Sequence, residues 1–195
     1  MRHGETDYNQ QRRIQGGGSN VDLNATGKKQ AKNIALYFKD KGIDAVYSSP
    51  LRRALVTAKA IAYYHGLKVH IEKNLREIDV GELEGVSLTE LSADLSTMLL
   101  GWEDGDGSRQ LPGGESLAEV RQRAIEIVER IIREQSRSAV IVSHFFVILS
   151  IVCAALEVPP DRIKMMRIKN GSVSILDYEA GKPILYSLND TCHQL

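Results

Sequence analysis

The 195 residues are enough for one domain with its own hydrophobic core, and 25 basic side chains balance 25 acidic ones. This zero net charge argues against a nucleic-acid binder, which usually carries a basic excess. The two cysteines, Cys153 and Cys192, lack the spacing of a metal site or a disulfide framework. No signal or transit peptide is recognisable, so we expect a cytoplasmic protein.

The first half of the chain alternates between helix and strand patterns. Residues 24–41 place apolar side chains at helical spacing behind a capping asparagine, and 44–49 is typical of a buried strand. A second helix is expected over 50–66, with Ser49 as its N-cap and the following proline in its first turn. The alternation in 67–72 predicts another strand.

The second half begins with a glycine-rich segment of weak periodicity, residues 81–114, which we interpret as a lid or insertion over the sheet. Ser116 starts a capping box that opens a long amphipathic helix. Near the C-terminus, two further strands are expected over 172–179 and 183–188, joined by a tight turn.

Between these elements, residues 139–156 are almost entirely apolar and are long enough to cross a membrane. A histidine at position 144 would be costly in lipid, and the flanks lack a basic cluster. We therefore favour a buried strand over 139–143 followed by a short buried helix, and expect no membrane association.

Strands that alternate with helices predict an α/β fold: a three-layer α/β/α sandwich with a mostly parallel central sheet and a small lid insertion. We expect a single domain over residues 1–195. Ser49 and His144 both stand at expected strand ends, where such sheets form a crevice.

Five residues scattered along the chain have side chains suited to phosphoryl chemistry. Arg2 and Arg53 carry planar guanidinium groups that match phosphate oxygens. His3 and His144 can attack, donate or accept a proton, and Glu77 supplies one acid in a loop beyond a strand. This set predicts an electropositive pocket that handles a phosphoryl group without a metal.

The segments "RHGETDYN", "SSPLRRALVTA", "LREIDVGELEG", "PGGES" and "VSH" occur in this order with suitable gaps. Together they resemble the histidine phosphatase superfamily, the group that contains the cofactor-dependent phosphoglycerate mutases. The tail "LNDTCHQL" is similar to the end of many small phosphatases in that group. The resemblance covers nearly the whole chain and points to the small, broad-specificity phosphatase branch.

The resemblance implies a role for each of the five residues. His3 would be the nucleophile that becomes phosphohistidine, Arg2 and Arg53 would clamp the phosphoryl oxygens, and His144 would add a donor. Glu77 would protonate the leaving oxygen and then activate water.

The resemblance also implies substrate contacts in the first loop. They would come from four residues: Gly4, Asn9, Gln15 and Gly16. Arg52, next to Arg53, falls at a variable position of the family and is expected to be a surface charge.

Several other polar residues have simpler explanations. Glu82 and Glu84 are expected to be solvated loop carboxylates, and Glu115 to be structural at the start of the long helix. The remaining histidines lack ligand spacing, so we expect no metal site.

The sequence departs from the family pattern at two positions. Family members have a buried strand before Arg-His-Gly, whereas here only Met1 precedes Arg2, so upstream apolar residues are expected to raise thermal stability. Phe145 stands where the family usually has glycine, and its bulk is expected to affect how substrate fits.

The function implied is a phosphomonoester hydrolase that acts on a small phosphorylated metabolite through phosphohistidine, with no cofactor. Two alternatives stay open: a cofactor-dependent phosphoglycerate mutase, and a phosphate-binding module without turnover. Residues 90–110 carry five carboxylates against the single Arg109, which disfavours a bisphosphate. The expected partner is the small phosphorylated substrate, and a homodimer stays open as the oligomeric state.

Overall fold

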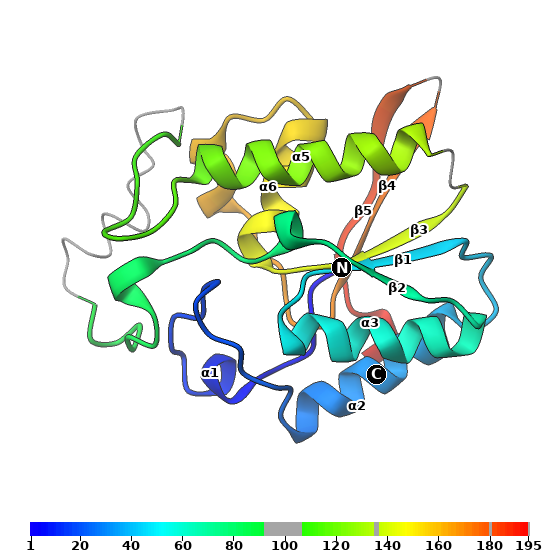
Figure 1. Cartoon of the computed structure of the whole chain (residues 1–195), viewed down its shortest axis with the longest axis horizontal. Coiled ribbons are helices and arrows are strands. Elements are labelled where there is room, and N and C mark those ends of the chain that lie inside the picture. Colours follow the sequence, from blue (N-terminus) through cyan, green and yellow to red (C-terminus); the bar gives the residue numbers. More distant parts are fainter. Residues whose placement is uncertain (92–106, 135–136, 180, 195) are drawn as a thin grey trace.

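The computed structural model describes residues 1–91, 107–134, 137–179 and 181–194 (Figure 1). Its centre is a parallel sheet of three strands in the order β2-β1-β3. The strands are β1 (Ala45–Ser48), β2 (Val69–Ile71) and β3 (Ala139–Val142). Val46 of β1 pairs with Val69 on one side and with Val140 on the other.

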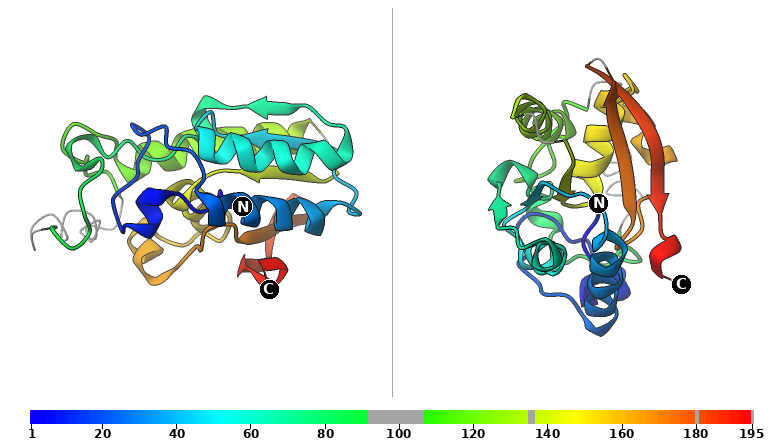
Figure 2. Two further views of the ribbon diagram at one scale, coloured as in Figure 1. Left: turned by 90° about the horizontal axis from the view of Figure 1, so that it is seen from below. Right: turned by 90° about the vertical axis from the view of Figure 1, so that its right-hand side faces the viewer.

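Helices cover both faces of this sheet, as Figures 1 and 2 show. They are α2 (Ala25–Phe38) and α3 (Arg52–His65) on one face, and α5 (Leu117–Arg133) and α6 (Phe145–Ala155) on the other. Successive side chains of a strand point to opposite faces, so Val46 joins the core of α2 and α3, whereas Tyr47 joins that of α5 and α6. The expected three-layer α/β architecture is confirmed.

The chain start lies beside β3. The Met1 ammonium donates to the Ile141 carbonyl at 2.8 Å, and the His3 amide donates to Ser143 at 3.1 Å. On the other side, the Arg2 amide donates to Ser172 at 3.1 Å. Ser172 leads into β4 (Val173–Glu179), which pairs antiparallel with β5 (Lys182–Asp190), seen in orange and red in Figure 2.

Most helix ends lie where the sequence places them. The Asn24 side chain accepts from the Gly27 amide at 2.8 Å, Gly66 ends α3 with φ of 62°, and Ser116 forms its capping box with Glu119. The predicted cap of α3 is wrong, because its N-cap is Leu51.

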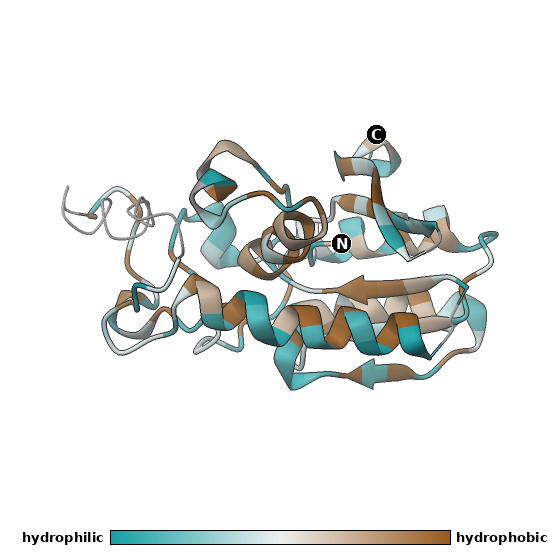
Figure 3. Ribbon diagram, turned by 90° about the horizontal axis from the view of Figure 1, so that it is seen from above, coloured by the Kyte–Doolittle hydropathy of each residue, from teal (hydrophilic) through white to brown (hydrophobic). Residues whose placement is uncertain are grey.

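Figure 3 shows how hydropathy follows these layers: α6 is apolar nearly all round, and α5 alternates between apolar and polar residues. An all-apolar helix is expected where both sides are covered by protein. Among the residues that the structure describes, every helix is too short or too polar to span a membrane.

Short elements connect these helices and strands. They are α1 (Asp7–Gln10), η1 (Lys73–Leu75), η2 (Gly81–Leu83), η4 (Pro160–Met165) and η5 (Cys192–Gln194). Of the expected lid, residues 92–106 lie outside the described residues. The described remainder contributes Leu83 and Leu111 to the core between the sheet and α5.

Candidate active site

The side chains selected from the sequence come from segments that converge at the carboxyl edge of the parallel sheet. His3 follows the residues paired with β3, His144 follows β3 itself, and Arg53 lies in the first turn of α3 after β1. Glu77 follows η1, the turn after β2. Parallel strands bring their ends to one edge, so His3 and His144, 141 positions apart in the sequence, become neighbours.

His3 is almost completely buried, with 2% of its surface exposed. Its Nδ1 lies 2.6 Å from the Gly4 carbonyl, an acceptor only, so Nδ1 carries the proton and Nε2 keeps its lone pair. Burial, followed by the charges of Arg53 and Arg2, holds the pKa of His3 well below its usual 6.5. The imidazole is therefore neutral near pH 7, as a nucleophile must be.

His144 packs beside His3, with ring centroids 5.0 Å apart. Its Nε2 lies 2.7 Å from the Ser49 hydroxyl, and within the described part of the chain its buried Nδ1 has no hydrogen-bond partner. Burial and then the Arg53 charge hold the pKa of His144 well below 6.5. Ser49, expected to cap a helix, thus orients a histidine instead.

The two arginines are held by backbone carbonyls. Arg53 is fully buried and donates to Ser19 at 2.8 Å and Gly16 at 3.0 Å, while Arg2 donates to Ile168 at 2.6 Å. Burial is the main cause that lowers both arginine pKa values to about 10, so both stay charged at neutral pH.

Within the described residues, neither Arg2 nor Arg53 forms an ion pair, and both Nε atoms are buried without a hydrogen-bond partner. Guanidinium groups with buried, unpartnered nitrogens favour an anionic ligand, because those nitrogens are desolvated without an acceptor.

Glu77 supplies the acid of the cluster and is 4% exposed. Its carboxylate accepts from the Ile78 amide at 3.0 Å and from the Phe146 amide, in the first turn of α6, at 3.4 Å. Burial raises the pKa of Glu77 above its usual 4.5, although these amides and the two arginines oppose the shift. A raised pKa keeps part of the carboxyl protonated at higher pH, as a proton donor requires.

The loop that holds Arg53 is itself fixed by Glu84, which sequence analysis wrongly treated as a solvated carboxylate. Its two oxygens accept from the amides of Gly16 at 3.0 Å and Gly18 at 3.1 Å. A Cβ on Gly16 would lie 2.8 Å from the Ile78 carbonyl, so this backbone has no room for a side chain. The glycines of "QGGG" could have indicated this role of Glu84. Backbone amides that donate from such a loop need an acceptor, and a nearby carboxylate can supply it.

Asn9 and Gln15 lie in a second layer beside His3. Thr6 is the N-cap of α1, and the Asn9 side chain completes the capping box by accepting from the Thr6 amide at 3.2 Å. The Asn9 side chain also accepts from Asn170 at 3.0 Å. The same Asn170 amide lies 3.4 Å from the His3 carbonyl. Gln15 accepts from Thr6 at 3.0 Å, and its buried Nε2 has no hydrogen-bond partner among the described residues.

Gly4 and Phe145 both act through close packing. The Gly4 amide donates to Thr57 at 3.3 Å, and a Cβ on Gly4 would lie 2.5 Å from the Gly27 carbonyl. The Phe145 ring centroid lies 5.6 Å from the Arg2 guanidinium carbon, a cation–π arrangement that holds Arg2 from the side of α6.

Two buried neutral histidines make stability depend on pH. Below about pH 6.5, His3 and His144 bind protons in the unfolded chain but stay neutral in the folded protein. The free energy of unfolding should therefore fall on acidification. Each contributes up to about 1.4 kcal/mol per pH unit in the range below its unfolded pKa. Glu77 acts oppositely, because its raised pKa loses stability as pH rises above about 4.5.

The measurement is urea unfolding of the protein and of His3→Gln at pH 7.5 and pH 5.5. The Met1 ammonium, whose pKa is lowered to about 5, acts in the same sense as the histidines, and it is common to both proteins. We expect a shallower pH dependence in His3→Gln, with exposed His70→Gln as control. Equal slopes in all three proteins would contradict the burial of a neutral His3.

Comparison with known proteins shows the family. The sequence model of the histidine phosphatase superfamily (branch 1) matches residues 1–191. Phosphoserine phosphatase 1 of Hydrogenobacter thermophilus is 33% identical over 99% of this chain and 92% of its own. A probable phosphoglycerate mutase GpmB of Yersinia enterocolitica is 32% identical over the same shares. The chain therefore belongs to the histidine phosphatase superfamily.

Solved structures give the same class. A phosphoserine phosphatase from Entamoeba histolytica, in complex with phosphoserine, is 31% identical with a TM-score of 0.87, covering 100% of this chain and 96% of that one. A mycobacterial glucosyl-3-phosphoglycerate phosphatase in complex with VO3 is 29% identical with a TM-score of 0.87, covering 97% and 96%.

Proposed function

We propose that this protein hydrolyses phosphomonoesters of small metabolites through a phosphohistidine formed on His3. The observation that carries the proposal is the state of His3: a buried, neutral imidazole with Nδ1–H fixed on the Gly4 carbonyl and with two arginines nearby. Because the single ring proton of the neutral imidazole is on Nδ1, Nε2 is unprotonated, and its lone pair can attack phosphorus.

In the first step, His3 Nε2 attacks phosphorus and the bond to the ester oxygen breaks. Protonated Glu77 gives its proton to that oxygen, which leaves as an alcohol. Arg2, Arg53 and His144 hold the equatorial oxygens, where the transition-state charge develops. Their fixed positions mean that little reorganisation is needed as that charge moves.

In the second step, the Glu77 carboxylate removes a proton from water, and the water oxygen attacks phosphorus. The bond between phosphorus and Nε2 breaks, which returns neutral His3 and inorganic phosphate. Glu77 ends protonated and ready for the next ester, so one carboxyl serves both steps.

For the substrate, we propose a small phosphorylated hydroxy acid. Support comes from the similar structures, which include phosphoserine phosphatase complexes with phosphoserine and with 3-phosphoglyceric acid. The buried, unpartnered Nε2 of Gln15 in the first loop adds a donor suited to oxygen atoms of the leaving alcohol.

The test is turnover of p-nitrophenyl phosphate, phosphoserine and 3-phosphoglycerate in the presence of EDTA. We expect phosphate release from all three, with the hydroxy-acid esters preferred in kcat/KM. Binding of phosphate without any turnover would favour the phosphate-binding module instead.

The mutase alternative has its own support, because a relative of equal coverage is named a probable phosphoglycerate mutase. Incubation with 3-phosphoglycerate and 2,3-bisphosphoglycerate separates the two activities. Hydrolysis predicts free phosphate and little 2-phosphoglycerate; rapid equilibration of the two monophosphates would replace our proposal by the mutase.

Glu77→Gln should separate its two roles. We expect kcat/KM for phosphoserine to fall roughly a hundredfold to a thousandfold, because an alkoxide leaves poorly without a proton. For p-nitrophenyl phosphate, kcat/KM should change far less, since nitrophenolate leaves unprotonated. The phosphoenzyme should then accumulate, visible as a burst of nitrophenolate.

The matched control is Glu82→Gln, an exposed carboxylate in η2, five residues further along the chain. It should leave both substrates within about twofold of the parent, as surface changes generally do. Equal losses for both substrates in Glu77→Gln, without a burst, would remove the assignment of Glu77 as proton donor.

A further inference from the structure

The segment that carries Glu77 has no regular structure of its own after η1 ends at Leu75. Arg76 is extended, with φ of −63° and ψ of 145°, and Glu77 follows it towards the sheet edge. A proton donor must nevertheless be held to within a fraction of an ångström of its partner. Some other group must therefore fix this backbone.

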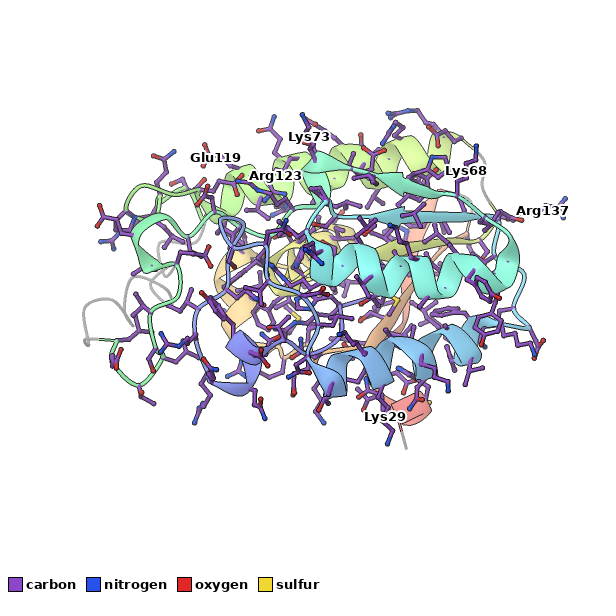
Figure 4. The ribbon with its side chains drawn as sticks, turned by 60° about the horizontal axis from the view of Figure 1, so that its bottom comes forward. Lys29, Lys68, Lys73, Glu119, Arg123 and Arg137 are labelled. Atoms are coloured by element: carbon purple, nitrogen blue, oxygen red, sulfur yellow. The ribbon has the colours of Figure 1, made fainter. Side chains whose placement is uncertain are left out.

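Arg123 of α5 supplies that group. One terminal nitrogen of its guanidinium donates to the carbonyls of Asn74 at 2.7 Å and Arg76 at 2.6 Å, and the other reaches the Glu77 carbonyl at 3.4 Å. In Figure 4 Arg123 extends from α5 into the body of the protein, whereas Lys29, Lys68 and Arg137 extend outwards. The Arg123 side chain thus connects α5 to the backbone just before Glu77.

Glu115 holds both Arg123 and the chain on the other side of Glu77. Its two oxygens accept from Arg123 at 2.9 and 3.0 Å, a bidentate pair. One of them also accepts from the Asp79 amide at 2.8 Å, and the Glu115 amide donates to the Asp79 carbonyl at 2.8 Å. Hydrogen bonds from this pair therefore fix the backbone of residues 74–79 both before and after Glu77.

We propose that Arg123 and Glu115 form a positioning unit that sets the Glu77 carboxyl against the leaving oxygen. The inference rests on the proposed function, because it concerns the same proton transfer. Neither residue touches the reacting atoms. Both act through the backbone that carries Glu77.

A purely structural pair would behave differently from a positioning unit. Loss of a structural tie lowers stability and affects all substrates alike. Loss of a positioning contact lowers the rate only where Glu77 gives a proton, and a displacement of about 1 Å can cost about a hundredfold. Since kcat/KM reports the steps up to release of the alcohol, the ratio of kcat/KM for two leaving groups distinguishes the cases.

The test compares Arg123→Met with Arg130→Met, using phosphoserine and p-nitrophenyl phosphate. Arg130 lies on the same helix and pairs with Glu72, ahead of η1, so its loss removes a comparable tie without touching the Glu77 carbonyl. We expect Arg123→Met to lower kcat/KM for phosphoserine about ten- to a hundredfold, and that for p-nitrophenyl phosphate less than about threefold. In Arg130→Met, the ratio of kcat/KM for phosphoserine to kcat/KM for p-nitrophenyl phosphate should stay at the parent value.

Guanidinium ion at millimolar concentration should partly restore phosphoserine turnover in Arg123→Met and leave Arg130→Met unchanged. If Arg123→Met does not fold, Glu115→Gln gives the same comparison, since it weakens the bidentate pair and retains an acceptor. Equal losses for both substrates would overturn the positioning role. A parent protein inactive on p-nitrophenyl phosphate would instead overturn the proposed function itself.

Discussion

Replacing His3 by alanine is expected to reduce phosphoester turnover on the order of ten-thousandfold or more, because no other group can form the covalent intermediate. The fold should survive. The His3 backbone keeps its bonds to Ser143 and Gly171, and among the described residues the imidazole forms its one hydrogen bond with the neighbouring Gly4 carbonyl. The loss therefore reports chemistry rather than unfolding.

Two measurements check this result. Brief incubation of the parent with substrate should add one phosphoryl group that withstands alkali and is lost in acid, as phosphohistidine is; His3→Ala should not acquire it. His70→Ala, an exposed histidine on β2, is the control and should retain activity and label. Retention of even a tenth of parental activity by His3→Ala would mean that another nucleophile operates.

Removing the charge of Arg53 should have the next largest effect. In Arg53→Met we expect kcat/KM to fall roughly a thousandfold, since a buried cation at a transferring phosphoryl group is worth at least that much in rate. Vanadate and inorganic phosphate should also bind much more weakly, because they occupy the same oxygen positions. Arg53→Lys should recover part of the loss, as it restores the charge without the planar fork.

Arg52 offers a control of the same residue type one position away. It pairs with Asp22 at 3.0 Å on the surface, and its side chain is 62% exposed. Exposed pairs contribute at most about 1 kcal/mol, so Arg52→Met should change activity less than about twofold. A similar loss in both variants would show that the effect comes from general destabilisation of α3.

The site as described explains why two positive charges can lie close together beside neutral histidines. Burial prevents either imidazole from taking a third or fourth charge, and Glu77 offsets the arginines only in its ionised form. The cluster therefore keeps an excess of positive charge, which is the electrostatic basis of the catalysis that we propose.

The sequence by itself determined the layers of this protein and the residue types of its site. Apolar periodicity located α2, α3 and α5 to within a few residues, because each must bury one face. A continuous apolar run located α6, which is covered by protein on more than one side. Local signals such as the Asn24 cap and the Ser116 capping box need only neighbouring residues to form. The motif order selected His3, Arg53 and Glu77, since their chemistry is uncommon in combination.

Only the tertiary structure decided which polar residues act together. Ser49 binds His144, which lies 95 positions away, rather than capping α3. Glu84 holds the loop of Gly16, and Arg123 holds the backbone of Glu77, yet both are ordinary charged residues in the sequence. Such contacts join segments that come together only because parallel strands end at one edge of the sheet. Local sequence periodicity cannot predict which distant segments these are.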